Sequence, residues 1–104
     1  MSVDIYTNSK AMAVSNHCLF EMKCELEDSI LEMFKNNEDI DEYGVTRFNY
    51  SNPEGEIFST EDVKLMYDTF KKIKVKESPY KGRINELIEL FEYAANNNQE
   101  VYLE

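Results

Sequence analysis

His17, Cys18 and Cys24 are the residues of this sequence best suited to nucleophilic or metal chemistry. A cysteine nucleophile needs a histidine that faces it, and His17 and Cys18 are neighbours whose side chains diverge on a helix. A zinc site needs about four ligands, and these three residues fall short of that number. Between Cys18 and Cys24 a helix turns by about 600°, which leaves the two side chains about 120° apart. We therefore predict two reduced thiols without a disulfide, as in a cytoplasmic protein.

Other familiar site patterns are incomplete in this sequence. Asp39, Asp41 and Gly44 have the spacing that begins a calcium-binding EF-hand loop, but Tyr43 and Tyr50 stand where that loop needs oxygen ligands. The three glycines of the chain are isolated from one another, so they do not form a phosphate-binding loop. We predict a protein that is not an enzyme and that holds no metal or cofactor.

Carboxylates dominate the remaining chemistry of the chain. Its 104 residues include 21 Asp and Glu against 11 Lys and Arg, which gives a net charge of −10. Residues 21–42 hold nine acids and only two lysines, a net charge of −7. Such a surface repels a bare phosphate backbone, which argues against direct binding of nucleic acid. We predict a partner-binding surface made of Glu21, Glu25, Asp28, Glu32, Glu38, Asp39, Asp41, Glu42 and Tyr43.

The acidic segment has two interpretations. Acids keep surface helices soluble, or they attract and orient a cationic partner. Glu21, Glu25, Asp28 and Glu32 recur at steps of three and four, which brings like charges together on one side of a helix. A sequence optimised for stability alone would place lysines between them, so we favour partner binding. The candidate aromatic anchors for this partner are Tyr6, Tyr43 and Tyr50.

Residues 71–83 carry the opposite charge, with six Lys and Arg against Glu77, a net charge of +5. Basic residues after a helix complement its dipole and keep a linker soluble. Tyr80 lies among these cations and would also suit stacking on a base, so contact with a small anion or RNA is the alternative. The negative charge of the whole chain favours the interpretation of residues 71–83 as a soluble linker over contact with a small anion or RNA.

The hydrophobic pattern predicts a long amphipathic helix that carries the acidic segment. Residues 3–7 precede it as a short strand or a docked arm. Ser15 or Asn16 suits the helix N-cap, and apolar residues then recur near every fourth position as far as about residue 36. The predicted apolar stripe consists of Cys18, Leu19, Met22, Leu26, Ile30, Leu31, Met33 and Phe34.

A hairpin is predicted after this helix. Residues 37–44 form a polar loop, and the alternation of residues 45–50, rich in β-branched and aromatic side chains, predicts a strand. The Asn-Pro-Glu-Gly sequence of residues 52–55 predicts a turn, and residues 56–58 are the return strand.

Two more helices and a strand are predicted in the rest of the chain. Ser59, with Asp62 three residues later, is a variant of the capping box that begins helices. Proline in the segment 74–81 separates this helix from a third, over residues 81–95 or 83–95. Residues 100–103 then form a terminal strand.

These elements predict one α+β domain over residues 1–104, in the order (β)αββααβ. Three amphipathic helices would pack on a small, mainly antiparallel sheet. The alternative is a mostly helical domain with one hairpin. The sequence has no apolar run of about 18 residues and no signal-like start, so we predict a cytoplasmic protein without membrane contact.

The second half of the chain has a familiar sequence texture. Residues 58–63 (FSTEDV) open a helix, and residues 86–98 (ELIELFEYAANNN) lead into the final strand at 101–103. This half resembles the small acidic immunity proteins of bacterial toxin systems, such as those paired with contact-dependent growth-inhibition toxins. The resemblance implies a non-enzymatic cytoplasmic inhibitor that binds one cognate toxin tightly. Many such toxins are nucleases with cationic clefts, which agrees with the separate charge argument.

Two other functions stay open at this point. A phage-type mimic of nucleic acid would block a host defence nuclease with the same acidic surface. A small enzyme or metal-dependent regulator would instead use His17, Cys18 and neighbouring acids.

Overall fold

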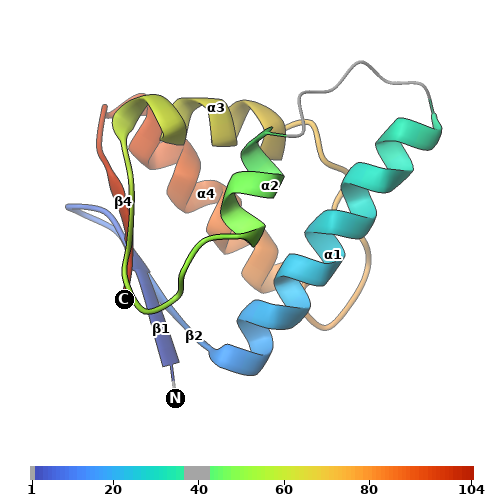
Figure 1. The fold of residues 1–104 in the computed structure, drawn as a ribbon, viewed down its shortest axis with the longest axis horizontal. Helices are drawn as coiled ribbons and strands as arrows, with labels where there is room; N and C mark the ends of the chain where they lie inside the picture. Colours follow the sequence, from blue (N-terminus) through green and yellow to red (C-terminus); the bar gives the residue numbers. More distant parts are fainter. Residues whose placement is uncertain (1, 37–42) are drawn as a thin grey trace.

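The computed structural model describes residues 2–36 and 43–104, and it confirms the predicted α+β class (Figure 1). One hydrophobic cluster draws buried residues from every helix and strand. The described residues contain four helices, one more than the sequence predicted. The elements are β1 (Ser2–Tyr6), β2 (Ala11–Ser15), α1 (Asn16–Lys35), α2 (Tyr43–Asn49), β3 (Glu56–Phe58), α3 (Thr60–Phe70), α4 (Lys81–Asn96) and β4 (Val101–Leu103).

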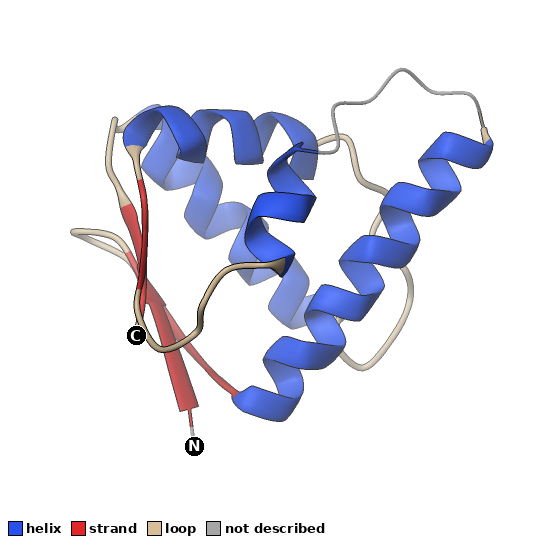
Figure 2. Cartoon of the chain, viewed as in Figure 1, coloured by secondary structure: helices blue, strands red, loops and turns tan. Residues whose placement is uncertain are grey.

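The four strands form one antiparallel sheet in the order β2-β1-β4-β3. The helices lie on one side of this sheet (Figure 2). Val3 and Ile5 of β1 pair with Val14 and Met12 of β2, and all four side chains are buried. Because side chains alternate along a strand, the residues between them face away from the helices.

Four phenylalanines form the centre of the core. Phe48 of α2 and Phe70 of α3 meet edge-on, with 6.0 Å between their ring centroids, and Phe70 meets Phe91 of α4 at 5.2 Å. Phe58 of β3 packs 5.9 Å from Phe91. All four are fully buried, and such tilted and edge-on arrangements are the favourable geometry for aromatic rings. This cluster joins the sheet to three of the four described helices.

The predicted strand over residues 45–50 is wrong, because residues 43–49 form α2. Val45 and Phe48 are both buried, and their spacing of three places them on one side of a helix. A strand would point them to opposite faces, so one of them would leave the core. Burial of both side chains therefore decides for the helix over the local preference for a strand.

The predicted hairpin is also wrong, because its first strand, over residues 45–50, does not form. Residues 56–58 do form a strand, β3, but it pairs with β4 rather than with residues 45–50. The strand β2 was not predicted at all, because Ala11 and Ala13 have low strand propensity. The hairpin of the structure is therefore β1–β2, in which the Thr7 N–H donates to the Lys10 carbonyl at 2.7 Å.

Candidate protein-binding surface

Four of the predicted acidic residues lie on one side of α1. Glu21, Glu25, Asp28 and Glu32 follow one another along the helix at steps of four, three and four, so their side chains form one row. We call this row the acidic face. The buried side of α1 is a separate stripe that consists of Leu19, Met22, Leu26, Ser29, Ile30 and Met33. The other four predicted acids, Glu38, Asp39, Asp41 and Glu42, lie outside the described residues.

The segment between α3 and α4 lies against one edge of the acidic face. The Ser78 hydroxyl donates to Glu25 Oε1 at 2.5 Å, and Lys76 Nζ lies 3.9 Å from Glu32 Oε2. The Ser29 hydroxyl reaches the Lys74 carbonyl at 3.4 Å. Part of the basic segment predicted as a linker therefore contacts the acidic helix. The Lys76–Glu32 pair is exposed, so it neutralises little of the charge.

Three other carboxylates of α1 keep their charge available. In the part of the chain that the structure describes, Glu21, Glu27 and Asp28 form no ion pair. They surround the half-buried thiol of Cys24. Burial raises the pKa of Cys24, and the charges of Glu21, Asp28 and Glu27 raise it further. The raised pKa of this thiol thus has two causes, first its burial and then the negative charges around it on the outer side of α1.

A groove runs beside these carboxylates, between α1 and α2. Its volume is about 450 Å³. Three of its side chains are unusually exposed for large apolar residues: Tyr50 at 85%, Phe20 at 62% and Leu31 at 51%. Glu27 and Asn49 also line it. We call this feature the α1–α2 groove; its apolar residues with an acidic margin resemble the composition of protein interfaces.

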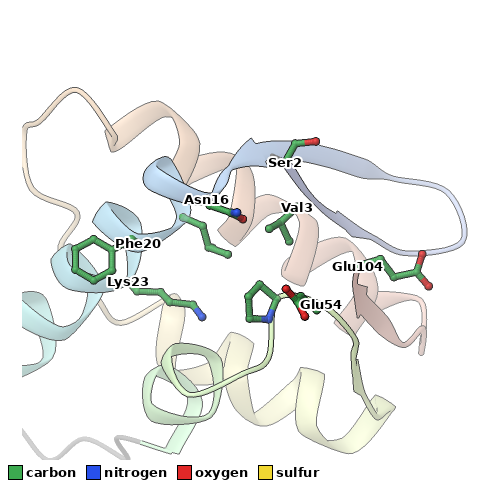
Figure 3. Close-up of a pocket in the computed structure, with 9 residues that line it drawn as sticks. Ser2, Val3, Asn16, Phe20, Lys23, Glu54 and Glu104 are labelled. Carbon is green, nitrogen blue, oxygen red and sulfur yellow. The ribbon is translucent and has the colours of Figure 1, made fainter.

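A second hollow of about 440 Å³ adjoins the groove at the start of α1 (Figure 3). Phe20 and Lys23 line both hollows. The Lys23 ammonium donates to the Ser51 carbonyl at 3.3 Å and lies 5.6 Å from the centre of the Phe48 ring. Burial lowers the pKa of Lys23, although the Glu56 carboxylate opposes that shift. Lys23 is therefore held by its own chain rather than by the carboxylates of the acidic face.

The predicted aromatic anchors separate in the structure. Tyr50 lines the α1–α2 groove. Tyr43 is partly exposed, but its hydroxyl donates to Asp62 Oδ1 at 2.7 Å and so joins α2 to α3. Hydrogen bonding to Asp62 and burial raise the pKa of Tyr43. Tyr6 stacks on Tyr102, 5.1 Å between ring centres, on the sheet face that points away from α1.

The buried stripe of α1 is narrower than the sequence predicted. Leu31 and Phe34 do not join it, because they are 51% and 43% exposed. At about 100° per residue, Leu31 points well away from Met22 and Leu26, and Phe20 points the same way as Leu31. This angle was the signal that could have identified Leu31 and Phe20 as surface residues.

The cysteines follow the prediction that they do not bridge, since both are free. His17 is exposed at the start of α1. Within residues 2–36 and 43–104, no three His, Cys, Asp or Glu side chains converge as ligands for a metal ion. No helix in this described part is long and apolar enough to cross a membrane.

Alkylation of Cys24 tests the negative field directly. In a Cys18→Ser background, we expect iodoacetamide to react with Cys24 more slowly at neutral pH than with a free cysteine, because a raised pKa leaves less thiolate. The rate should keep rising at pH values where a free thiol is already ionised. Combining Glu21→Gln with Asp28→Asn should increase the neutral-pH rate about threefold. Glu89→Gln on α4 is the control, and an equal increase there would contradict a local field.

Comparison with known proteins gives no relative for this surface. A scan against protein-family models, a search of curated proteins and a search of solved structures each found no match.

Proposed function

We propose that this chain is an immunity-type inhibitor that binds a cognate cationic toxin, a nuclease, and neutralises it in the cytoplasm. One observation carries the proposal: Glu21, Glu27 and Asp28 stand together on the outer side of α1 without an ion pair to any described residue. If these acids served only solubility, lysines placed between them would make the helix more stable. The unpaired cluster instead suits a partner that supplies the cations.

The proposed mechanism is competition for phosphate-binding residues. A nuclease cleft holds its substrate with lysines and arginines that neutralise phosphates. The carboxylates of α1 would pair with those side chains, so that nucleic acid no longer enters the cleft. Like charge concentrated on one surface also raises the rate of encounter with an oppositely charged protein. The inhibitor would need neither catalysis nor a cofactor.

The geometry around the cysteines supports a binding protein over an enzyme. His17 and Cys24 lie two turns apart on α1, about 10 Å along the helix axis, which exceeds the reach of a hydrogen bond. The raised pKa of Cys24 also makes its thiol a poor nucleophile at neutral pH.

Co-expression tests the proposal. We expect the chain to restore growth of bacteria that express the toxin domain encoded beside its own gene, and to stop nuclease activity of that domain at equimolar concentration in vitro. The double variant Glu21→Lys, Asp28→Lys should protect poorly, and Glu86→Lys, Glu89→Lys, with the same change in net charge, should protect fully.

Two results would contradict the proposal. Inhibition that the α1 variant leaves unchanged would remove the acidic side of α1 from the mechanism. Failure to inhibit the neighbouring gene product, together with inhibition of a host defence nuclease, would favour the nucleic-acid mimic instead.

A further inference from the structure

We propose that the α1–α2 groove binds an amphipathic, basic helix of the partner, with one large apolar side chain of that helix inserted between Phe20, Leu31 and Tyr50. The inference rests on the proposed function and adds the element that the groove would recognise. Charge alone attracts many cationic proteins, whereas an apolar anchor in a shaped hollow selects among them.

The exposed side chains are concentrated rather than scattered. Phe20 and Leu31 come from α1 and Tyr50 directly follows α2, yet all three line the same groove. Single exposed apolar residues are common on protein surfaces, but several around one hollow mark a binding site. A volume of about 450 Å³ is large enough for a bulky side chain and part of the helix that carries it.

The margin of the groove determines the charge of the occupant. Glu27 lines the groove, and Glu21 and Asp28 lie on the adjoining side of α1, all without an ion pair to a described residue. Lys23 also lines the groove, but its ammonium is held by the Ser51 carbonyl. An acidic segment would be repelled, whereas lysines or arginines beside the anchor would meet carboxylates.

A buried acceptor at the groove lacks a donor. The Asn49 side chain donates from Nδ2 to the Lys23 carbonyl at 3.2 Å, and this bond fixes the orientation of the amide. Asn49 Oδ1 is buried and accepts no hydrogen bond from any residue that the structure describes. An unmet buried acceptor is unfavourable, so a small shift of the side chains beside Asn49 would let a lysine or arginine in the groove donate to it.

Other occupants fit these features less well. A second copy of the chain would bring its own acidic α1 toward this margin, and like charges would oppose one another. An extended strand needs the free backbone groups of a sheet edge, which two helices do not offer. A helix laid in a groove between helices, with its apolar side down and basic side chains at the margin, meets every requirement.

Nuclear magnetic resonance with synthetic peptides tests this inference without the natural partner. The probe is a helical peptide of about 15 residues with Leu and Phe one turn apart, bordered by lysines and arginines. Titrated into the isotope-labelled chain of residues 1–104, it should shift the signals of Phe20, Leu31, Asn49 and Tyr50. One control peptide replaces Leu and Phe with Ala, and another replaces every basic residue with Glu. Both should bind at least about tenfold more weakly.

Variants of the chain separate this inference from the proposed function. The double variant Leu31→Ser, Tyr50→Ser should bind the probe peptide about tenfold or more weakly. The control variant Leu65→Ser, which removes a similarly exposed side chain from α3, should bind the probe peptide as tightly as the wild type. Circular dichroism establishes that each variant is folded. Signals that shift elsewhere, or equal binding of the alanine peptide, would overturn the inference. If the double variant Leu31→Ser, Tyr50→Ser still inhibits the toxin at full strength, the groove proposal is wrong. The proposed inhibition through the carboxylates of α1 would be unaffected by that result.

Discussion

Replacing Gly44 with alanine should lower the free energy of unfolding by about 1–3 kcal/mol, even though alanine is the better helix former. Gly44 is buried in α2, where a Cβ atom would lie 2.7 Å from Cβ and Oγ1 of Thr69 and 2.8 Å from Cα of Met66. The Met66 atom belongs to the backbone of α3, so a rotamer change cannot relieve that contact. The two helices would have to move apart.

Gly82→Ala is the matched control for this prediction. Gly82 is also in a helix, α4, and has no positive φ. A Cβ atom at Gly82 would meet no described atom within 4 Å beyond its neighbours in the same helix. Alanine there should raise the free energy of unfolding by about 0.5 kcal/mol, because it only restricts the unfolded chain. Urea unfolding of both variants measures the difference, and stabilisation by Gly44→Ala would contradict the close packing of α2 on α3.

The position of α2 matters for function as well as for stability. Figure 1 shows α2 between α1 and α3, and Tyr50 follows its last residue directly. Gly44 and the Tyr43–Asp62 hydrogen bond hold α2 against α3, so the α1–α2 groove depends on both. We therefore expect Gly44→Ala to shift the magnetic resonance signals of Tyr50 and to weaken the binding of the basic probe peptide to the α1–α2 groove.

Local signals predicted the long helices. The Ser15 hydroxyl accepts from the N–H of Cys18, and the Ser59 hydroxyl accepts from the N–H of Asp62, as the two proposed caps require. Both helices also bury a long periodic stripe, so sequence and packing agree. Of the two predicted starts of α4, Lys81 and Arg83, the structure has Lys81, and the predicted terminal strand is confirmed as β4.

Tertiary contacts decided the elements that the sequence did not identify. Residues 43–49 are too few to distinguish the periodicity of a helix from that of a strand in the sequence. Only the burial of both Val45 and Phe48 decides for a helix. The choice of β4 as partner for β3 depends on segments far apart in the chain. Likewise, spacing predicted a row of acids on α1, but only the fold reveals the Ser78 contact to Glu25.

Reversing two charges on α1 should slow association with the cationic partner about tenfold or more at low salt. The variant is Glu21→Lys combined with Asp28→Lys, because neither residue has an ion pair within the described part of the chain. Glu25 is a poorer choice, since its reversal would also remove the contact with Ser78. Stopped-flow association measured at about 50 mM and about 500 mM salt should show a weaker salt dependence for the variant.

The control for this experiment changes the net charge equally at a distant surface. Glu86→Lys with Glu89→Lys alters α4 and removes only the exposed ion pair of Glu86 with Arg83, which contributes little to stability. A loss of steering that depended only on net charge would slow both double variants alike. If the carboxylates of α1 guide the partner, the association rate should fall far more for the α1 variant than for the α4 variant. Dissociation should also become faster, because the same carboxylates pair with cations of the partner in the docked complex. Equal association rates for wild type and the α1 variant would show that these carboxylates do not guide the partner.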